Sequence, residues 1–192
     1  MIAKGFDFPR VTLVGIIAAD ISIHMGDFRS AEKTFQLLTQ VSGRAGRADM
    51  PGRAFIQTYN PEHYSIRFAC SGDYKGFYER EALLREKMSY PPFASLFAAL
   101  VSGEDEKKLV AAMIALKKIM DSHNADGRFD IYNPSPAAAP KIKGVYRWKI
   151  IVKSADEESL RSFALLCLSE LRNTTDLNGL LINETMNPLN IP

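Results

Sequence analysis

The second half of the chain alternates between strand-type and helix-type hydrophobic periodicity in an order that few folds accommodate. The six segments predicted from this periodicity are, in chain order, a strand at 96–101, a helix at 104–122, a strand at 129–132, a strand at 145–153, a helix that carries Leu160 to Leu171, and a strand at 179–185. Strand–helix–strand–strand–helix–strand is the split βαβ order of ferredoxin-like domains. We therefore expect a ferredoxin-like α+β domain over residues 93–192.

Two local signals refine this expectation. Ser154 and Glu157 have the spacing of a capping box, which predicts Ser154 as the N-cap of the last helix. The segment NPSPAAAP, residues 133–140, is rich in proline and is predicted to be a stiff connector.

The first part of the chain has the pattern of an α/β domain. Val11–Ala19 is almost continuously apolar, which predicts a strand covered on both faces in a parallel sheet. A helix is predicted from Ser30 to about residue 42, a strand over 53–59, and a helix from Pro61 to about residue 70. This alternation predicts part of a parallel-sheet domain over residues 1–72.

The segment 73–92 is predicted to connect the two domains. Asp73 is a suitable N-cap for a helix that must end before the Pro91–Pro92 pair. The apolar residues expected along one side of this helix are Tyr74, Phe77, Tyr78, Leu84 and Met88.

Composition limits the classes of function. The net charge of +2 over 192 residues gives no global electrostatic argument for nucleic-acid binding, so a basic surface has to be local. Cys70 and Cys167 lie far apart without a metal-ligand spacing, so we expect no metal site and two reduced, buried thiols. No apolar run reaches the roughly 18 residues of a membrane span, and we expect a cytoplasmic protein.

The stretch QLLTQVSGRAGR, residues 36–47, carries the strongest functional signal. Glycine costs about 1 kcal/mol against alanine inside a helix, so Gly43 and Gly46 must serve another purpose. Glycines let a backbone approach phosphate groups, and the guanidinium groups of Arg44 and Arg47 neutralise phosphate charge. The alternative is an ordinary basic helix end that a glycine terminates.

Gln40, Gly43, Arg44, Gly46 and Arg47 fill the pattern QxxGRxGR, which resembles motif VI of superfamily two helicases. Residues 1–9, MIAKGFDFP, resemble the second half of motif V. The further segments IQTYNPEH, FYEREALLREKMSYPPF and NPSPAAAPKIKGVYRWKIIVK extend the resemblance to the primosomal replication-restart helicases over nearly the whole chain. Phe6 and Asn187 depart from this family's usual residues, histidine and aspartate.

The resemblance implies a partial RecA-like second helicase lobe followed by the ferredoxin-like domain. It implies catalytic roles for Arg47 as an arginine finger and for Arg44 and Gln40 at the γ-phosphate. It also implies ATP contacts from Gly5, Asp7, Gly43 and Gly46. Because Met1 coincides with an interior methionine of motif V, the chain is expected to be a fragment.

The resemblance further implies an ATP-dependent 3′–5′ DNA helicase that recognises stalled or branched replication forks and initiates primosome assembly. ATP with Mg²⁺ is the implied cofactor, and zinc belongs only to a cysteine-rich segment that these residues lack. The implied partners are forked DNA, single-strand-binding protein, primosome and helicase-loader proteins, and the remaining domains of the helicase. The pattern GxxxxGK[ST] does not occur in the 192 residues, so we expect this chain by itself not to hydrolyse ATP.

A basic strand in the second domain is the candidate DNA-binding surface. Alternation over 145–153 separates Tyr146, Trp148, Ile150 and Val152 from Arg147, Lys149, Ile151 and Lys153. The five predicted phosphate contacts are Lys141, Lys143, Arg147, Lys149 and Lys153. Trp148 is predicted to pack in the core. The alternatives are a solvated sheet face, an RNA-binding module without catalysis, and a fragment of another superfamily two helicase.

Overall fold

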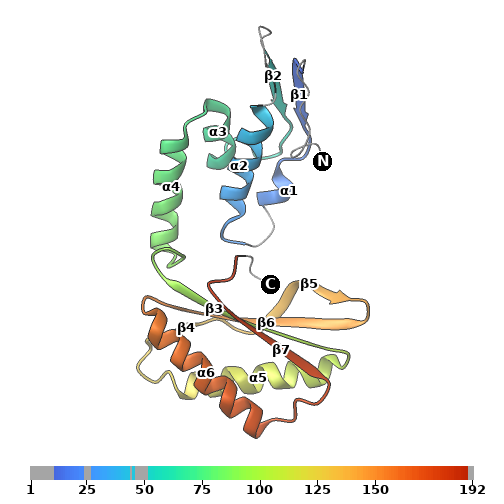
Figure 1. Ribbon diagram of the computed structural model, residues 1–192, viewed down its shortest axis with the longest axis vertical. Coiled ribbons are helices and arrows are strands. Elements are labelled where there is room, and N and C mark those ends of the chain that lie inside the picture. Colours follow the sequence, from blue (N-terminus) through green and yellow to red (C-terminus); the bar gives the residue numbers. More distant parts are fainter. Residues whose placement is uncertain (1–10, 24–26, 44, 46–51, 190–192) are drawn as a thin grey trace. The chain divides into compact units, whose positions relative to one another are not determined.

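A computed structural model of the chain describes residues 11–23, 27–43, 45 and 52–189 (Figure 1). The chain forms two compact units, Met1–Leu84 and Arg85–Pro192, each with its own hydrophobic core. The domain limits expected from the sequence, at residues 72 and 92, stay a prediction.

The first unit is a small α/β layer. Strands β1 (Leu13–Ile16) and β2 (Arg53–Ile56) pair in parallel. The helices of this unit are α1 (Asp20–Ile23), α2 (Ser30–Ser42), α3 (Tyr64–Ser71) and α4 (Tyr74–Lys87), the last of which runs past the unit's boundary. Its buried core consists of Ala19, Phe35, Leu38, Ile66, Ala69 and Phe77.

The prediction that the strand at Val11–Ala19 is covered on both faces is wrong for the described residues. β1 has only four residues, and Leu13 and Ile17 are 62% and 80% exposed. β2 is the one described strand that pairs with β1. An apolar run shows only that cover is favourable, because the cover itself comes from other segments.

Asp20 ties the carboxyl ends of the two parallel strands together. Its carboxylate accepts hydrogen bonds from the Thr58 hydroxyl at 2.6 Å and from the backbone N–H of Tyr59 at 2.8 Å and of Asn60 at 3.2 Å. These bonds, that from Thr58 foremost, hold the pKa of the Asp20 carboxyl below its usual range. The loop after β2 is thereby anchored to the start of α1.

Helix α4 buries only part of the side expected from the sequence: Phe77 is buried and Leu84 is half-buried, as predicted. Tyr74 and Tyr78 are exposed, whereas Phe77 and Glu81 are buried. The Phe77 ring stacks on Phe35 with 4.1 Å between ring centroids, and the Tyr64 hydroxyl donates to Glu81 Oε2 at 2.6 Å. Apolar spacing predicted Phe77 but missed Glu81, because a carboxylate with a hydrogen-bond donor occupies a core position there.

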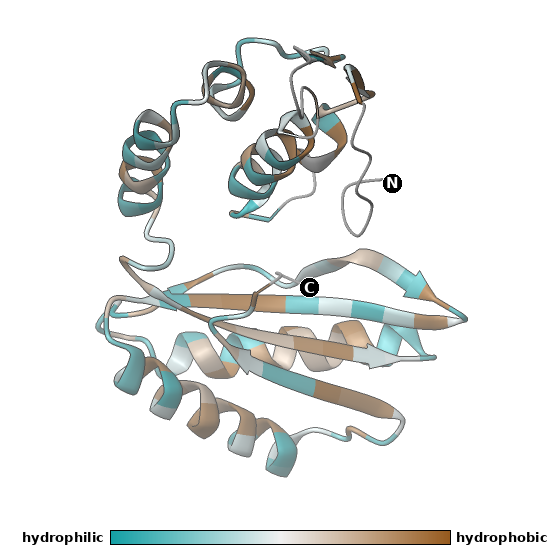
Figure 2. Ribbon diagram, turned by 45° about the horizontal axis from the view of Figure 1, so that its top comes forward, coloured by the Kyte–Doolittle hydropathy of each residue, from teal (hydrophilic) through white to brown (hydrophobic). Residues whose placement is uncertain are grey.

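The second unit has the predicted ferredoxin-like fold. Its elements are β3 (Ser95–Gly103), α5 (Glu106–Ser122), β4 (Asp130–Ile131), β5 (Ser135–Ile142), β6 (Val145–Ser154), α6 (Glu157–Thr174) and β7 (Leu180–Met186). The antiparallel strand order is β4–β6–β3–β7, with β5 also paired to β6. Both helices lie on one face of the sheet (Figure 2).

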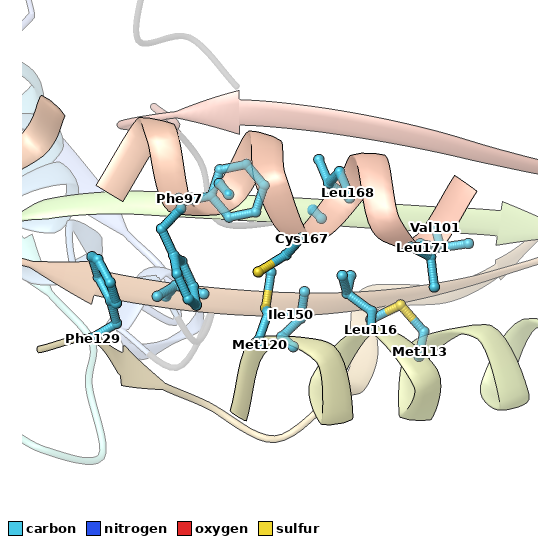
Figure 3. Close-up of a cluster of buried hydrophobic side chains, with 14 of the residues drawn as sticks. Phe97, Val101, Met113, Leu116, Met120, Phe129, Ile150, Cys167, Leu168 and Leu171 are labelled. Atoms are coloured by element: carbon cyan, nitrogen blue, oxygen red, sulfur yellow. The ribbon is translucent and has the colours of Figure 1, made fainter. Parts of the chain in front are cut away.

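The core of this unit fills the space between the helices and the sheet (Figure 3). Leu109, Met113, Leu116 and Met120 of α5 are fully buried, as their spacing predicts. Cys167 lies in the same core, and burial raises the pKa of its thiol to about 11. Cys70 is exposed, so the expectation of two buried thiols holds for Cys167 alone.

The prediction that the proline-rich segment 133–140 is a stiff connector is wrong, because most of this segment lies in strand β5. Pro136 pairs with Trp148 and Lys141 pairs with Tyr146, and an irregularity lies between these two pairs. β5 pairs only with β6 among the described strands, so it is an edge strand, where proline is tolerated.

The side-chain amide of Asn187, the residue after β7, links β3 to the start of α6. Its Oδ1 accepts from the Leu96 N–H at 2.9 Å, and its Nδ2 donates to Glu157 Oε2 at 3.0 Å. The Ser95 hydroxyl and the Asn187 amide, in that order, lower the pKa of Glu157. An aspartate at position 187 would lack the amide donor and would set two carboxylates side by side.

The N-cap of α6 is Asp156 rather than the predicted Ser154. The Asp156 carboxylate accepts from the backbone N–H groups of Glu158 and Ser159, both at 3.1 Å. Ser154 ends β6, and its hydroxyl accepts from the Asp156 N–H. The capping-box spacing placed the cap two residues early because β6 extends through Ser154.

We predict that Asp156→Ala destabilises the second unit while Ser154→Ala has a much smaller effect. The hydrogen bonds from Ser159, foremost, hold the pKa of Asp156 below its usual range. Since the folded-state pKa is lowered, this stabilisation is complete above the unfolded pKa of about 3.9 and is lost as pH falls through the folded value. Urea denaturation at pH 7 and at pH 3 measures both effects. A larger loss from Ser154→Ala would contradict the assignment of the cap.

Candidate nucleic-acid interface

The end of helix α2 carries part of the predicted nucleotide-facing motif. Gln40 and Gly43 are both exposed. Gly43 has a helical backbone with φ of −67°, and its N–H donates to Thr39 O at 3.0 Å. A Cβ at this position would meet the backbone only at 3.4 Å, so local geometry does not require glycine at residue 43.

The other residues of this prediction lie outside the described part of the chain. These are Gly5, Asp7, Arg44, Gly46 and Arg47. Their proposed roles, and that of Gln40, therefore stay predictions.

The alternation predicted for β6 is present. Ile150 and Val152 are fully buried in the core, and Tyr146 and Trp148 pack against it, as predicted for Trp148. Arg147 and Lys149 point to the opposite face of the sheet, where their partners on β3 are Ser102 and Leu100. Both cations are half-buried, so they border this face rather than extend freely from it.

Lys153 is on the predicted face of β6, but it is only 3% exposed, so the prediction that it contacts DNA is wrong. Its ammonium donates to the Met88 carbonyl at 2.9 Å and lies 3.7 Å from the centroid of the Tyr90 ring and 4.9 Å from that of Tyr132. Across the described residues, no carboxylate pairs with Lys153. The carbonyl and the two rings supply the negative potential that a buried ammonium requires.

This contact was missed because it depends on segments far from β6 in sequence. Tyr90 belongs to the YPPF segment, which the sequence assigned only to a connector. Tyr132 follows β4, and desolvation, followed by the charge of Asp130, raises its pKa. Lys153 thus joins the connector to the sheet.

Lys141 also lies elsewhere than predicted. Lys141 pairs with Tyr146, which places it on the helix side of the sheet, opposite to Arg147 and Lys149. Its ammonium donates to the Tyr146 hydroxyl at 2.8 Å and lies 4.0 Å from the ring centroid. The irregularity in β5 changes the face that Lys141 occupies, which strand alternation alone could not reveal.

Lys143 lies in the two-residue turn between β5 and β6. Lys143 and Gly144 have φ values of 48° and 90°, as the central residues of a type I′ turn require. Lys143 is exposed at the tip of this hairpin.

The segment 131–154, which contains β5 and β6, is strongly basic although the whole chain is not. Residues 131–154 contain Lys141, Lys143, Arg147, Lys149 and Lys153 and no aspartate or glutamate. Because Lys153 is buried, four cations remain at the surface. The outer-face positions of β3 and β6 carry no aromatic side chain, so this surface offers phosphate contacts rather than base stacking.

Comparison with known proteins identifies the family. Residues 86–176 match the family described as "Primosomal protein N C-terminal domain". The replication restart protein PriA of Bacillus subtilis is 44% identical over 190 residues, which cover 98% of this chain and 23% of that protein. This chain belongs to the PriA family. The family resemblance that was stated from the sequence segments above is therefore confirmed.

Other PriA proteins are also similar to this chain. The protein of Synechocystis is 39% identical over 153 residues, which cover 80% of this chain and 18% of that protein. The protein of Treponema pallidum is 34% identical over 191 residues, which cover 100% of this chain and 28% of that protein. The chain thus spans about a quarter of the length of these PriA relatives. Among solved structures, a de novo designed protein with a ferredoxin fold matches 50% of this chain and 86% of its own, at 19% identity and a TM-score of 0.34.

Two further features of this PriA-family chain bear on function. Across the described residues, every helix falls short of the length or hydropathy that a bilayer crossing requires. The same residues contain no group of three His, Cys, Asp or Glu side chains that could hold a metal ion.

We predict that Lys153→Gln lowers the free energy of unfolding by roughly 1–3 kcal/mol, because a charged hydrogen bond and a desolvated cation–π contact are lost together. Lys107→Gln, at an exposed position of α5, is the matched control and should change stability little. A double-mutant cycle with Tyr90→Leu measures the coupling. Additive effects of the two substitutions would contradict the contact.

Proposed function

We propose that this chain acts in replication restart as part of a PriA-type, ATP-dependent 3′–5′ DNA helicase at stalled or branched forks. The second unit contributes to DNA binding through phosphate contacts. The basic segment 131–154, which contains no aspartate or glutamate and lies in the unit that matches the family, is the observation that carries this proposal. Forked DNA, single-strand-binding protein, primosome and helicase-loader proteins are the proposed partners, and the cytoplasm is the proposed location.

Arg147 and Lys149 are the proposed centre of the DNA contact. They lie two residues apart on one face of β6, so their charges point the same way. Without aromatic side chains or a rigid donor pattern along β3, this face positions a phosphate backbone and does not read sequence. Such binding suits a protein that acts at forks of any sequence.

The first unit is proposed to serve the ATPase cycle. Arg47 would stabilise the charge on the transferred phosphoryl group, with Arg44 and Gln40 at the γ-phosphate and Gly5, Asp7, Gly43 and Gly46 near the nucleotide. ATP with Mg²⁺ is the proposed cofactor, held by a phosphate-binding loop that these 192 residues do not contain.

We expect the double variant Arg147→Gln/Lys149→Gln to weaken binding to fluorescent forked and duplex DNA and to flatten its salt dependence. Each phosphate contact that is removed should lower the slope of log K against log salt by about 0.9 on duplex DNA. Fluorescence anisotropy at several salt concentrations measures this, with Lys107→Gln as the control. Binding that equals that of the wild type would remove these two residues from the interface.

The purified chain should not hydrolyse ATP, with or without forked DNA, because it lacks the P-loop pattern that holds the phosphates. A phosphate-release assay measures this directly. DNA-stimulated phosphate release that Arg47→Ala abolishes would show that the chain holds ATP by other residues.

A further inference from the structure

The sheet of the second unit has two edges that differ in how they are protected. At one edge, β5 pairs only with β6 among the described strands, and it contains Pro136, Pro140, Lys141 and an irregularity. Proline, lysine and bulges prevent an edge strand from pairing with another chain. At the other edge, β7 pairs only with β3 among the described strands and has none of these features. β7 is therefore open to pairing with a further strand.

The backbone of β7 directs hydrogen-bonding groups toward this open edge. The Asn187 N–H donates to the Leu96 carbonyl at 2.7 Å, so the backbone of Asn187 faces β3. In an antiparallel sheet, successive residues direct their backbone groups to opposite sides of the strand. The N–H and C=O groups of Ile182, Glu184 and Met186 are therefore directed away from β3.

The side chains on the outer face of β7 carry no charge. Leu181, Asn183 and Thr185 alternate with residues that pack against the core, Ile182 and Met186, so they point away from the helices. All three are exposed. Across the described residues, the side-chain amide of Asn183 has no hydrogen-bond partner. Since an amide is both a donor and an acceptor, it can pair with a second asparagine.

The strand β7 is complementary to a second copy of itself. When two β7 strands pair in antiparallel order about a twofold axis at Asn183, every residue of Leu180–Met186 lies opposite a residue of the other copy. Leu181 then lies opposite the partner's Thr185, so the outer faces of the two sheets coincide. Asn183 lies opposite the partner's Asn183 in a non-hydrogen-bonded pair, where side chains approach closely and each amide can donate to the other.

Charge favours this register over its neighbours. Glu184, the only charged residue of β7, lies opposite the partner's Ile182 and retains its ion pair with Arg172 of α6, at 3.0 Å. A shift by two residues in either direction shortens the pairing. One of these shifts sets Glu184 opposite the partner's Glu184, and like charges directly opposite each other are destabilising.

Helix α6 adds an apolar contact beside the open edge. Because Arg172 pairs with Glu184, the side of α6 that carries Arg172 faces β7. Leu165 lies seven residues before Arg172, two helical turns away on the same side. Its side chain is 53% exposed. A second copy that pairs with β7 brings its own α6 to this side and can cover Leu165.

We propose that the second unit forms a twofold-symmetric dimer in which two β7 strands pair in antiparallel order, centred on Asn183, and extend the sheet across both copies. The contact is one strand and one helix side wide, so the association is reversible and depends on concentration. The inference does not depend on the proposed function, because Arg147 and Lys149 lie on β6, two strands from this edge.

Analytical ultracentrifugation of the 192-residue chain, from micromolar to near-millimolar concentration, tests the contact. We expect a monomer–dimer equilibrium for the wild type. Asn183→Lys and Asn183→Asp each place like charges at the twofold axis, so each should raise the dimer dissociation constant by at least about tenfold. A mixture of these two variants places opposite charges there and should restore the dimer. Asn173→Lys, at an exposed position of α6, is the control and should behave as the wild type.

A disulfide tests the register. The background variant is Cys70→Ser, because Cys70 is exposed whereas Cys167 is buried. In it, Asn183→Cys should form a disulfide-linked dimer under mild oxidation, since the Cα atoms of a non-hydrogen-bonded pair lie about 4.5 Å apart, within the range of a disulfide. Leu181→Cys should not, because the two copies of residue 181 would lie about 14 Å apart. A non-reducing gel separates the two results.

Three results would overturn the proposal. The first is a wild-type chain that stays monomeric over the whole concentration range, whether or not it binds DNA. The second is an association that Asn183→Lys leaves unchanged and Phe55→Lys, at an exposed position of β2, abolishes, because the contact would then lie in the first unit. The third is cross-linking through Leu181→Cys and not through Asn183→Cys.

Discussion

The register between β3 and β6 is the constraint on which the second unit depends. It runs without interruption from Ser95 opposite Ser154 to Gly103 opposite Tyr146. A shift by one residue would move Ile150 and Val152 out of the core and Arg147 and Lys149 into it. The same pairing therefore decides both where the hydrophobic core lies and which face carries positive charge. Gly103 belongs to this constraint, since a Cβ there would lie 2.5 Å from the Leu180 side chain.

Charge in this unit is distributed according to what surrounds each cation. Lys153 is buried close to the rings of Tyr90 and Tyr132 and serves the fold, whereas Arg147, on the same face of β6, is half-buried. Lys141 reaches the opposite face because β5 is irregular. The net charge of +2 hides this local concentration, since acids elsewhere in the chain balance it. The phosphate binding proposed for this unit rests on the positions of its cations and not on the total charge of the chain.

Polar contacts join several elements of the first unit in addition to its hydrophobic core. Asp20 anchors the loop after β2, and the bond between Tyr64 and Glu81 joins α3 to α4 beside the stacked rings of Phe35 and Phe77. These contacts place the end of α2, with Gln40 and Gly43, on a supported helix. That support suits a motif whose proposed task is to present guanidinium groups to a nucleotide.

The sequence by itself determined the type and order of most elements, although not of α1 and β5, because hydrophobic periodicity is a local property. The ferredoxin-like order, the stripe of α5 and the core position of Trp148 all follow from spacing along one segment. Membership of the PriA family could also be predicted from the sequence, because motifs V and VI and the YPPF segment are continuous stretches of residues.

The tertiary structure alone decided the features that depend on contacts between segments far apart in the sequence. Proline content indicated a connector at 133–140, but pairing with β6 made most of it a strand. Alternation placed Lys153 at the surface, but Met88, Tyr90 and Tyr132 bury it. Glu81 of α4 is buried, and Tyr64 of α3 supplies the hydrogen-bond donor to its carboxylate. Burial and charge at a residue depend on what packs against it, and that partner lies elsewhere in the chain.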